Sequence, residues 1–154
     1  MNLIDKLNSA LHSANIKNTQ ELHKVIRSLN ISLDEVSPFI KQPSELEYGR
    51  NVIFSNDYAE VIIVYLPSFA KTFIHDHGSS AGSLFIIQGK LLNILYDKTD
   101  EGIQFSKTES YEENDGFLVQ GDTIHMMYNP TLSPVISFHV YTPPLQNSTS
   151  YPSN

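Results

Sequence analysis

The chain has 154 residues, of which 40% are hydrophobic and 18% charged, and this length and composition suit one globular domain with a real core. Its formal net charge is −7 and no basic cluster offsets it, so we do not expect nucleic acid as a partner. The sequence has no cysteine, which excludes disulfides and thiolate ligands, so any bound metal must use histidine or oxygen ligands.

Neither a targeting segment nor a membrane segment is evident. The N-terminal stretch is amphipathic, and Asp5 and Lys6 interrupt any apolar run there, unlike in a signal peptide. No apolar stretch approaches the length of a membrane span. We therefore expect a cytoplasmic protein that does not associate with membranes.

The first 40 residues are predicted to be helical. Apolar residues recur at helical spacing on two segments, at Leu3, Ile4, Leu7 and Leu11 and at Leu22, Val25, Ile26 and Leu29. Helix starts are predicted at Asn18 and Ser32, because a glutamate follows each of them by three residues. We expect these helices to form a packing layer, with His12 and His23 as surface or packing residues.

From Tyr48 onward the sequence changes to short β-rich runs separated by turn residues. The predicted strands are Gly49–Ser55, Ala59–Leu66, Thr72–His75, Ser83–Gln88, Lys90–Asp97, Gly102–Tyr111, Gly116–Val119, Ile124–Tyr128 and Pro134–Tyr141. Many short strands without intervening helices indicate a mainly β fold, an antiparallel barrel or sandwich. We expect a single domain over 1–145, with a helical layer at 1–45 and the β-barrel at 46–145, and a disordered tail at 146–154.

Three histidines in the β-rich region are candidate metal ligands. Alternate residues of a strand point to the same side, so His75 and His77 would direct two imidazoles into one interior. His125, from a distant strand, would complete a three-histidine site with open positions for chemistry. The alternative is that His75 and His77 are hydrogen-bonded core histidines.

The spacing of these residues resembles the two sequence motifs of the cupin barrels. His75-x-His77 with Gly89 resembles the first motif, and Gly116, His125 and Asn129 fit the outline of the second. Most cupins add a glutamate four to five residues after the second histidine, but here Gly82 occupies that place. A site of neutral imidazoles would leave the full charge on the metal and favour an anionic ligand such as a thiolate. Asp76 points the other way by strand parity and is expected to be structural or to support the ligands.

A second polar row lies on the last predicted strand. Ser137, His139 and Tyr141 alternate with apolar residues and would form a hydrogen-bonded relay on one face. A solvated surface row is the alternative. A serine hydrolase fits poorly, because no nucleophile elbow and no orienting aspartate accompany the serine and histidine.

Tyr48 and Arg50 also share one strand face. A buried arginine offers paired donors that suit a carboxylate, whereas an ordinary surface arginine is the alternative when these residues are considered alone.

Taken together, these motifs resemble cysteine dioxygenase, a cupin-fold thiol dioxygenase. The resemblance extends over the stretches Tyr48–Asn51, Ile74–His77, Gly89, Ile124–His125, Ser137–Tyr141 and Pro143–Pro144, and it includes the helical N-terminus. It implies a cupin-type antiparallel β-barrel (jelly roll) with the N-terminal helices packed outside.

The resemblance also implies roles for individual residues. Iron(II) would be bound by His75, His77 and His125. The carboxylate of cysteine would pair with Arg50, with Tyr48 beside it. The relay would be formed by Ser137, His139 and Tyr141. A cis peptide would fall at Thr142-Pro143. Animal members carry a cysteine that crosslinks to the active-site tyrosine where this chain has Gly82, so the chain resembles the bacterial members that lack the crosslink.

The expected activity is therefore oxidation of L-cysteine by O2 to cysteine sulfinic acid at an Fe(2+) site, by a monomer. Three alternatives stay open. One is a dioxygenase for 3-mercaptopropionate or another small thiol, although related enzymes usually carry glutamine at the position of Arg50. The others are a zinc site that ionises water and a non-enzymatic cupin that senses a ligand.

Overall fold

The computed structural model describes residues 1–12 and 16–152. Its helices are α1 (Leu3–Ala10), α2 (Thr19–Ser28), α3 (Leu33–Val36) and the 3-10 helix η1 (Ser37–Phe39). Its strands are β1 (Gly49–Ser55), β2 (Glu60–Leu66), β3 (Ile74–His75), β4 (Ala81–Gln88), β5 (Leu91–Thr99), β6 (Gly102–Tyr111), β7 (Gly116–Val119), β8 (Ile124–Tyr128), β9 (Val135–Thr142) and β10 (Ser150–Tyr151). Over the described residues, none of the helices combines the length and apolar character needed to cross a bilayer.

The helix starts follow from local capping, as predicted. The Asn18 side chain accepts a hydrogen bond from the backbone N–H of Glu21 at the start of α2. Ser32 and Glu35 form a complete capping box at the start of α3, each side chain accepting from the backbone of the other. These bonds satisfy N–H groups that have no partner inside the helix.

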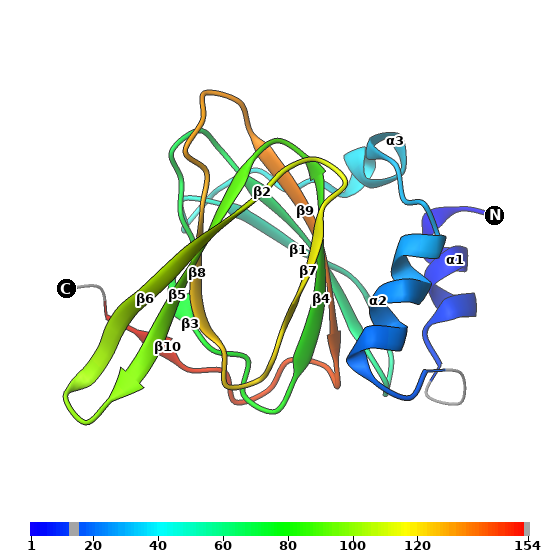
Figure 1. Cartoon of the computed structure of the whole chain (residues 1–154). Coiled ribbons are helices and arrows are strands. Elements are labelled where there is room, and N and C mark those ends of the chain that lie inside the picture. Colours follow the sequence, from blue (N-terminus) through cyan, green and yellow to red (C-terminus); the bar gives the residue numbers. More distant parts are fainter. Residues whose placement is uncertain (13–15, 153–154) are drawn as a thin grey trace.

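The strands form two five-stranded antiparallel sheets that face one another (Figure 1). The first sheet has the order β1-β2-β9-β4-β7, and the second has the order β10-β3-β8-β5-β6. The predicted strands all correspond to observed ones, four of them with identical bounds. The strands divide into two hydrogen-bonded sheets and do not close into one continuous barrel, which is the jelly-roll form of the predicted architecture.

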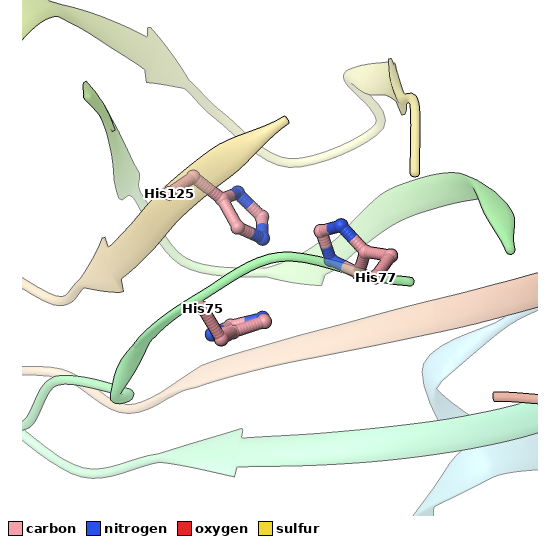
Figure 2. A group of neighbouring side chains, drawn as sticks. All are labelled: His75, His77 and His125. Carbon is pink, nitrogen blue, oxygen red and sulfur yellow. The ribbon is translucent and has the colours of Figure 1, made fainter. Parts of the chain in front are cut away.

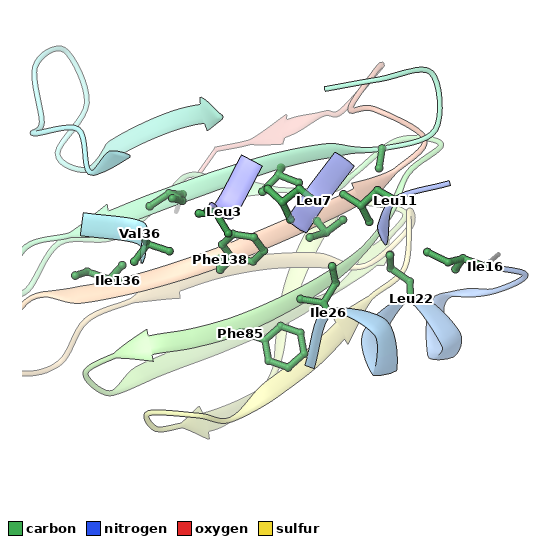
Figure 3. Packing of buried hydrophobic residues seen from close by; sticks show 14 residues of the cluster. Leu3, Leu7, Leu11, Ile16, Leu22, Ile26, Val36, Phe85, Ile136 and Phe138 are labelled. Carbon is green, nitrogen blue, oxygen red and sulfur yellow. The ribbon is translucent and has the colours of Figure 1, made fainter. Parts of the chain in front are cut away.

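Two apolar clusters lie on opposite faces of the first sheet. The outer cluster joins α1 and α2 to this sheet and includes Leu7, Ile26, Phe85 and Phe138 (Figure 3). The inner cluster lies between the two sheets. Its members include Ile62, Val64, Leu84, Ile86, Phe117 and Met127. Because the first sheet is buried on both faces, its central strands are apolar almost throughout, whereas the edge strand β6 is largely exposed.

The segment after β9 corrects one prediction. We expected disorder at 146–154, but Ser150 and Tyr151 form β10 and pair with His75 and Ile74 of β3; residues 153 and 154 lie outside the described part. Asp76 accepts hydrogen bonds from the Thr149 N–H at 2.8 Å and from the Tyr151 hydroxyl at 2.8 Å. Composition alone misled here, because the order comes from these long-range bonds. The cis peptide expected at Thr142-Pro143 is present.

Candidate metal site and substrate pocket

The three candidate ligands come together inside the jelly roll (Figure 2). His75 at the end of β3 and His125 on β8 are direct partners in the strand register. His77 lies just beyond β3, where its backbone N–H donates to the Gly121 carbonyl. Their ligating nitrogens lie within 4.8 Å of one another, and the ring centroids are 4.8 to 5.0 Å apart.

The hydrogen bonds of these rings leave nitrogen lone pairs for a metal. His75 donates through Nδ1 to the Phe73 carbonyl at 2.7 Å, and His125 donates through Nδ1 to Asn93 Oδ1 at 2.6 Å. Among the described residues, His125 Nε2 and both nitrogens of His77 are buried without a hydrogen-bond partner. Unpaired buried polar atoms are costly in a folded protein, and a cation that accepts nitrogen ligands would satisfy them. The group therefore fits a divalent metal, as the pattern of histidines predicted.

The environment keeps the three rings neutral. Burial lowers the pKa of His75, lowers that of His77 to about 4, and holds that of His125 well below its ordinary value. The neighbouring histidines act in the same direction on His77 and His125, because two like charges cannot share so small a space. At neutral pH each ring is therefore uncharged and has one nitrogen without a proton, the form that binds a metal.

The predicted relay is present on β9. Ser137 Oγ lies 2.7 Å from His139 Nε2, and His139 Nδ1 lies 2.9 Å from the Tyr141 hydroxyl. All three side chains are buried, which removes the solvated-surface alternative. Burial lowers the pKa of His139 to about 3 and raises the pKa of Tyr141 far above its ordinary value. The pair is therefore neutral at pH 7, and the Tyr141 ring is stacked on His77 with centroids 5.4 Å apart.

Arg50 lies at the mouth of the pocket and is exposed, which corrects the expectation of a buried arginine. It pairs with Val64 of β2, which in turn pairs with Ser137 of β9, so one cross-strand row connects Arg50 to the relay. Tyr48, just before β1, is half-buried beside the same pocket. Burial raises the pKa of Tyr48, and the nearby Arg50 charge opposes this increase.

One pocket of about 240 Å³ is bordered by two of the three candidate ligands and by two members of the relay. Tyr48, Arg50, His75, His77, His139 and Tyr141 line it, together with apolar residues that include Ile62, Val64 and Phe73. The C-terminal segment adds Leu145, Ser148 and Ser150 to its wall. Sequence reasoning missed these three, since no local pattern connects them to the histidines. In the described part of the chain, Arg50 is the one lysine or arginine in the lining.

Gly82 lies directly opposite Tyr141 in the pairing of β4 with β9. A Cβ atom at Gly82 would lie 2.8 Å from the Tyr141 ring, closer than such atoms normally approach. The position that carries a carboxylate in most cupins thus has no room for a side chain while Tyr141 keeps this place. Among the described residues, this group of candidate ligands consists of three neutral imidazoles and contains no carboxylate.

His23 and Asp76 have structural contacts, and Asp76 also belongs to the lining of the pocket. His23 lies 2.6 Å from Ser83 Oγ and stacks on Phe85, and His12 is exposed. Asp76 anchors the C-terminal segment. Asn93, which the sequence reasoning did not single out, contacts His125 directly; a polar residue at a buried position of an apolar strand was the signal available.

The sequence matches the family described as cysteine dioxygenase type I over residues 1–154. It is 24% identical over 156 residues to cysteine dioxygenase type 1 of Danio rerio, a match that covers 97% of this chain and 77% of that protein.

Solved structures with low sequence identity share the fold. A Klebsiella pneumoniae protein with a double-stranded β-helix domain has a TM-score of 0.62 at 16% identity, covering 77% of this chain and 95% of that chain. A cupin domain from Schizosaccharomyces pombe has a TM-score of 0.58 at 14% identity, covering 69% and 70% of the two chains. These likenesses confirm the predicted cupin fold.

Proposed function

Because the chain belongs to the cysteine dioxygenase type I family, we propose that it is an iron(II) enzyme that oxidises L-cysteine with O2 to cysteine sulfinate. The family and the three-histidine group support a thiol dioxygenase. The proposal adds the identity of the metal, the substrate and the roles of individual side chains. The observation that carries it is the meeting of neutral imidazoles, a cationic side chain and a buried phenol at one small pocket.

His75, His77 and His125 would hold the iron through the ring nitrogens that face one another. Iron(II) bound there would supply open positions for the substrate thiolate and for O2. Since the three rings are neutral, they do not offset the charge of a cation, and this favours an anionic sulfur ligand. Both atoms of O2 would end on the sulfur.

Arg50 would bind the carboxylate of cysteine. A guanidinium offers two parallel N–H donors to two carboxylate oxygens, and Arg50 lies at the pocket mouth, where it would hold the carboxylate end of a small thiol while the sulfur reaches the histidines. Tyr48 beside it would contribute a hydroxyl to the same end of the substrate. The apolar side chains of Ile62 and Val64, which line the same pocket, would exclude water from the substrate carbons.

Tyr141 would donate a hydrogen bond to the substrate sulfur or to an oxygen atom being added to it. The relay permits this when Ser137 donates to His139 Nε2 and His139 Nδ1–H donates to the phenol oxygen, leaving the phenol proton free. Burial supports the role, because the raised pKa of Tyr141 keeps its proton in place at neutral pH.

The test is O2 uptake by the iron-loaded protein, with L-cysteine and 3-mercaptopropionate compared at equal concentration. With ¹⁸O2 we expect cysteine sulfinate carrying two ¹⁸O atoms, and faster turnover of cysteine than of the thiol acid. The zinc-loaded protein is the control and should consume no O2. Preference for 3-mercaptopropionate would contradict the proposed substrate. Full activity with zinc, or thiol binding without O2 uptake, would contradict the dioxygenase itself.

A further inference from the structure

A chain of hydrogen bonds extends from His125 outward across the second sheet. His125 Nδ1 donates to Asn93 Oδ1 at 2.6 Å, and Asn93 Nδ2 donates to Glu109 Oε1 at 3.3 Å. Asn93 on β5 is the direct strand partner of Glu109 on β6. Asn93 is buried, whereas the Glu109 side chain is 35% exposed at the sheet edge. These two hydrogen bonds thus connect Glu109 at the protein surface to the candidate metal ligand His125.

The chemistry of these groups fixes the direction of every bond. An ionised carboxylate can only accept, so the amide nitrogen of Asn93 must face Glu109. The amide oxygen then faces His125, and since it can only accept, the His125 proton must be on Nδ1. Nε2 is left as the unprotonated nitrogen, and it is the atom buried without a partner near His75 and His77.

We propose that Glu109, acting through Asn93, is a positioning residue that sets the tautomer of His125 and thereby presents Nε2 to the metal. This inference rests on the proposed function in one respect, the role of His125 as a ligand. Hydrogen bonds to the second nitrogen of a ligating histidine commonly fix its tautomer and orientation. Here the group that decides the direction is one residue further out.

His75 and His125 differ in the kind of acceptor that holds Nδ1. His75 donates to a backbone carbonyl, which cannot reverse its polarity. Asn93, in contrast, carries an oxygen and a nitrogen of similar size, and rotating its amide by half a turn would present a donor to His125. That arrangement would move the His125 proton to Nε2 and block the ligand atom. The Glu109 carboxylate disfavours this rotated arrangement, because it can only accept and would then face the amide oxygen of Asn93.

Glu109 is itself held in place. The Tyr111 hydroxyl donates to the same carboxylate oxygen at 2.9 Å, and the Tyr111 ring stacks on Phe117 with centroids 4.3 Å apart. Lys107 Nζ lies 3.5 Å from the other oxygen. Because Glu109 is partly exposed and next to the Lys107 ammonium, its charge is screened at the distance of the three histidines. Its effect on His125 therefore comes from the direction of the hydrogen bonds.

The experiment measures cobalt(II) affinity by chelator competition in the full-length protein. We expect Asn93→Leu to weaken binding by about 10- to 100-fold, and Glu109→Gln, which offers Asn93 a donor as well as an acceptor, to weaken it by a few-fold. Asn93→Asp alone places two acceptors together and should also weaken binding. The double variant Asn93→Asp with Glu109→Gln restores one donor between the two positions, and its affinity should return to the wild-type level or exceed it.

Two further measurements separate positioning from a general loss of structure. Glu113→Gln, which removes an exposed carboxylate from the turn after β6, should bind cobalt like the wild type. The ¹⁵N spectrum of the His125 ring in metal-free protein should show the Nδ1–H tautomer, and Glu109→Gln should show a mixture of tautomers.

An unchanged tautomer and cobalt affinity in Glu109→Gln, or a double variant no better than its worse parent, would overturn the inference. If the wild type binds cobalt but its iron-loaded form oxidises no thiol, the proposed function is contradicted and the role of Glu109 is unaffected.

Discussion

The two faces of β9 are both buried, yet they carry different chemistry. Ile136, Phe138 and Val140 pack under the helices in the outer cluster. Ser137, His139 and Tyr141 face the space between the sheets and bond to one another. Because side chains alternate between the two faces of a strand, β9 presents packing residues on its outer face and the relay on its inner face. Substitutions on the outer face should reduce the free energy of unfolding, and those on the inner face should change metal binding and turnover.

The largest effect is expected at the candidate metal group. His125→Ala removes one of three ligands from a fully buried position, so the protein should retain no iron after dialysis and should lose thiol oxidation. Metal content by elemental analysis and O2 uptake measure this. His12→Ala, at an exposed histidine, is the control. One iron per chain with full turnover in His125→Ala would remove His125 from the site.

A substitution on the outer face should lower the free energy of unfolding and leave metal binding in place. Phe138→Ala leaves a cavity at a side chain with 0% exposure and should lower the free energy of unfolding by about 3–5 kcal/mol. Chemical denaturation measures the loss. Phe105→Ala on β6, at a phenylalanine that is 58% exposed, should cost less than about 0.5 kcal/mol. If Phe138→Ala instead abolished metal binding in protein that is still folded, the two faces would not be separable.

The relay predicts a change in rate with little change in stability. Tyr141→Phe removes one hydroxyl and should lower kcat about 10²-fold, the usual scale for a positioned proton donor. The free energy of unfolding should fall by about 1 kcal/mol, the worth of one hydrogen bond. Steady-state kinetics with the iron-loaded protein test this. Tyr65→Phe, on β2 against the outer cluster, should keep the wild-type kcat, and an equal loss in both variants would argue against the relay.

Arg50 lies at the margin of the inner face, and its removal should affect substrate binding. Arg50→Ala should raise KM for L-cysteine about tenfold, since a charge-assisted pair to a carboxylate is worth about 1.5–3 kcal/mol and this one is partly solvated. Metal content should stay the same. Arg27→Ala, at an exposed arginine on α2, should leave KM unchanged. An unaltered KM in Arg50→Ala would exclude it from the substrate pocket.

The inner face also predicts a pH effect on the metal-free protein. The pKa of His139 is lowered by burial to about 3, against about 6.5 in the unfolded chain. Above pH 6.5 neither state binds the proton, and below it only the unfolded state does, so stability falls as the pH decreases toward 3. His139 alone should contribute about 1.4 kcal/mol per pH unit between pH 6 and 5. Denaturation of wild type and His139→Gln measures this, and equal slopes would contradict it.

Much of this arrangement could be predicted from local patterns. Alternation placed Ser137, His139 and Tyr141 on one face, and turn residues marked the strand ends closely. The prediction was less successful where burial depends on distant segments. Arg50 is exposed because β1 is an edge strand of its sheet. The polar C-terminal segment is ordered because the Thr149 N–H and the Tyr151 hydroxyl donate hydrogen bonds to the Asp76 carboxylate.

The sequence by itself determined the fold class, the strands and the side chains able to bind a metal, since these follow from periodicity and from the chemistry of each residue. The tertiary structure decided which nitrogen of each imidazole is free, how wide the pocket is and which segment closes it. Those properties depend on hydrogen bonds between residues far apart in the chain, such as His125 with Asn93 and Asn93 with Glu109. Strand register, which no local pattern specifies, brings these pairs together.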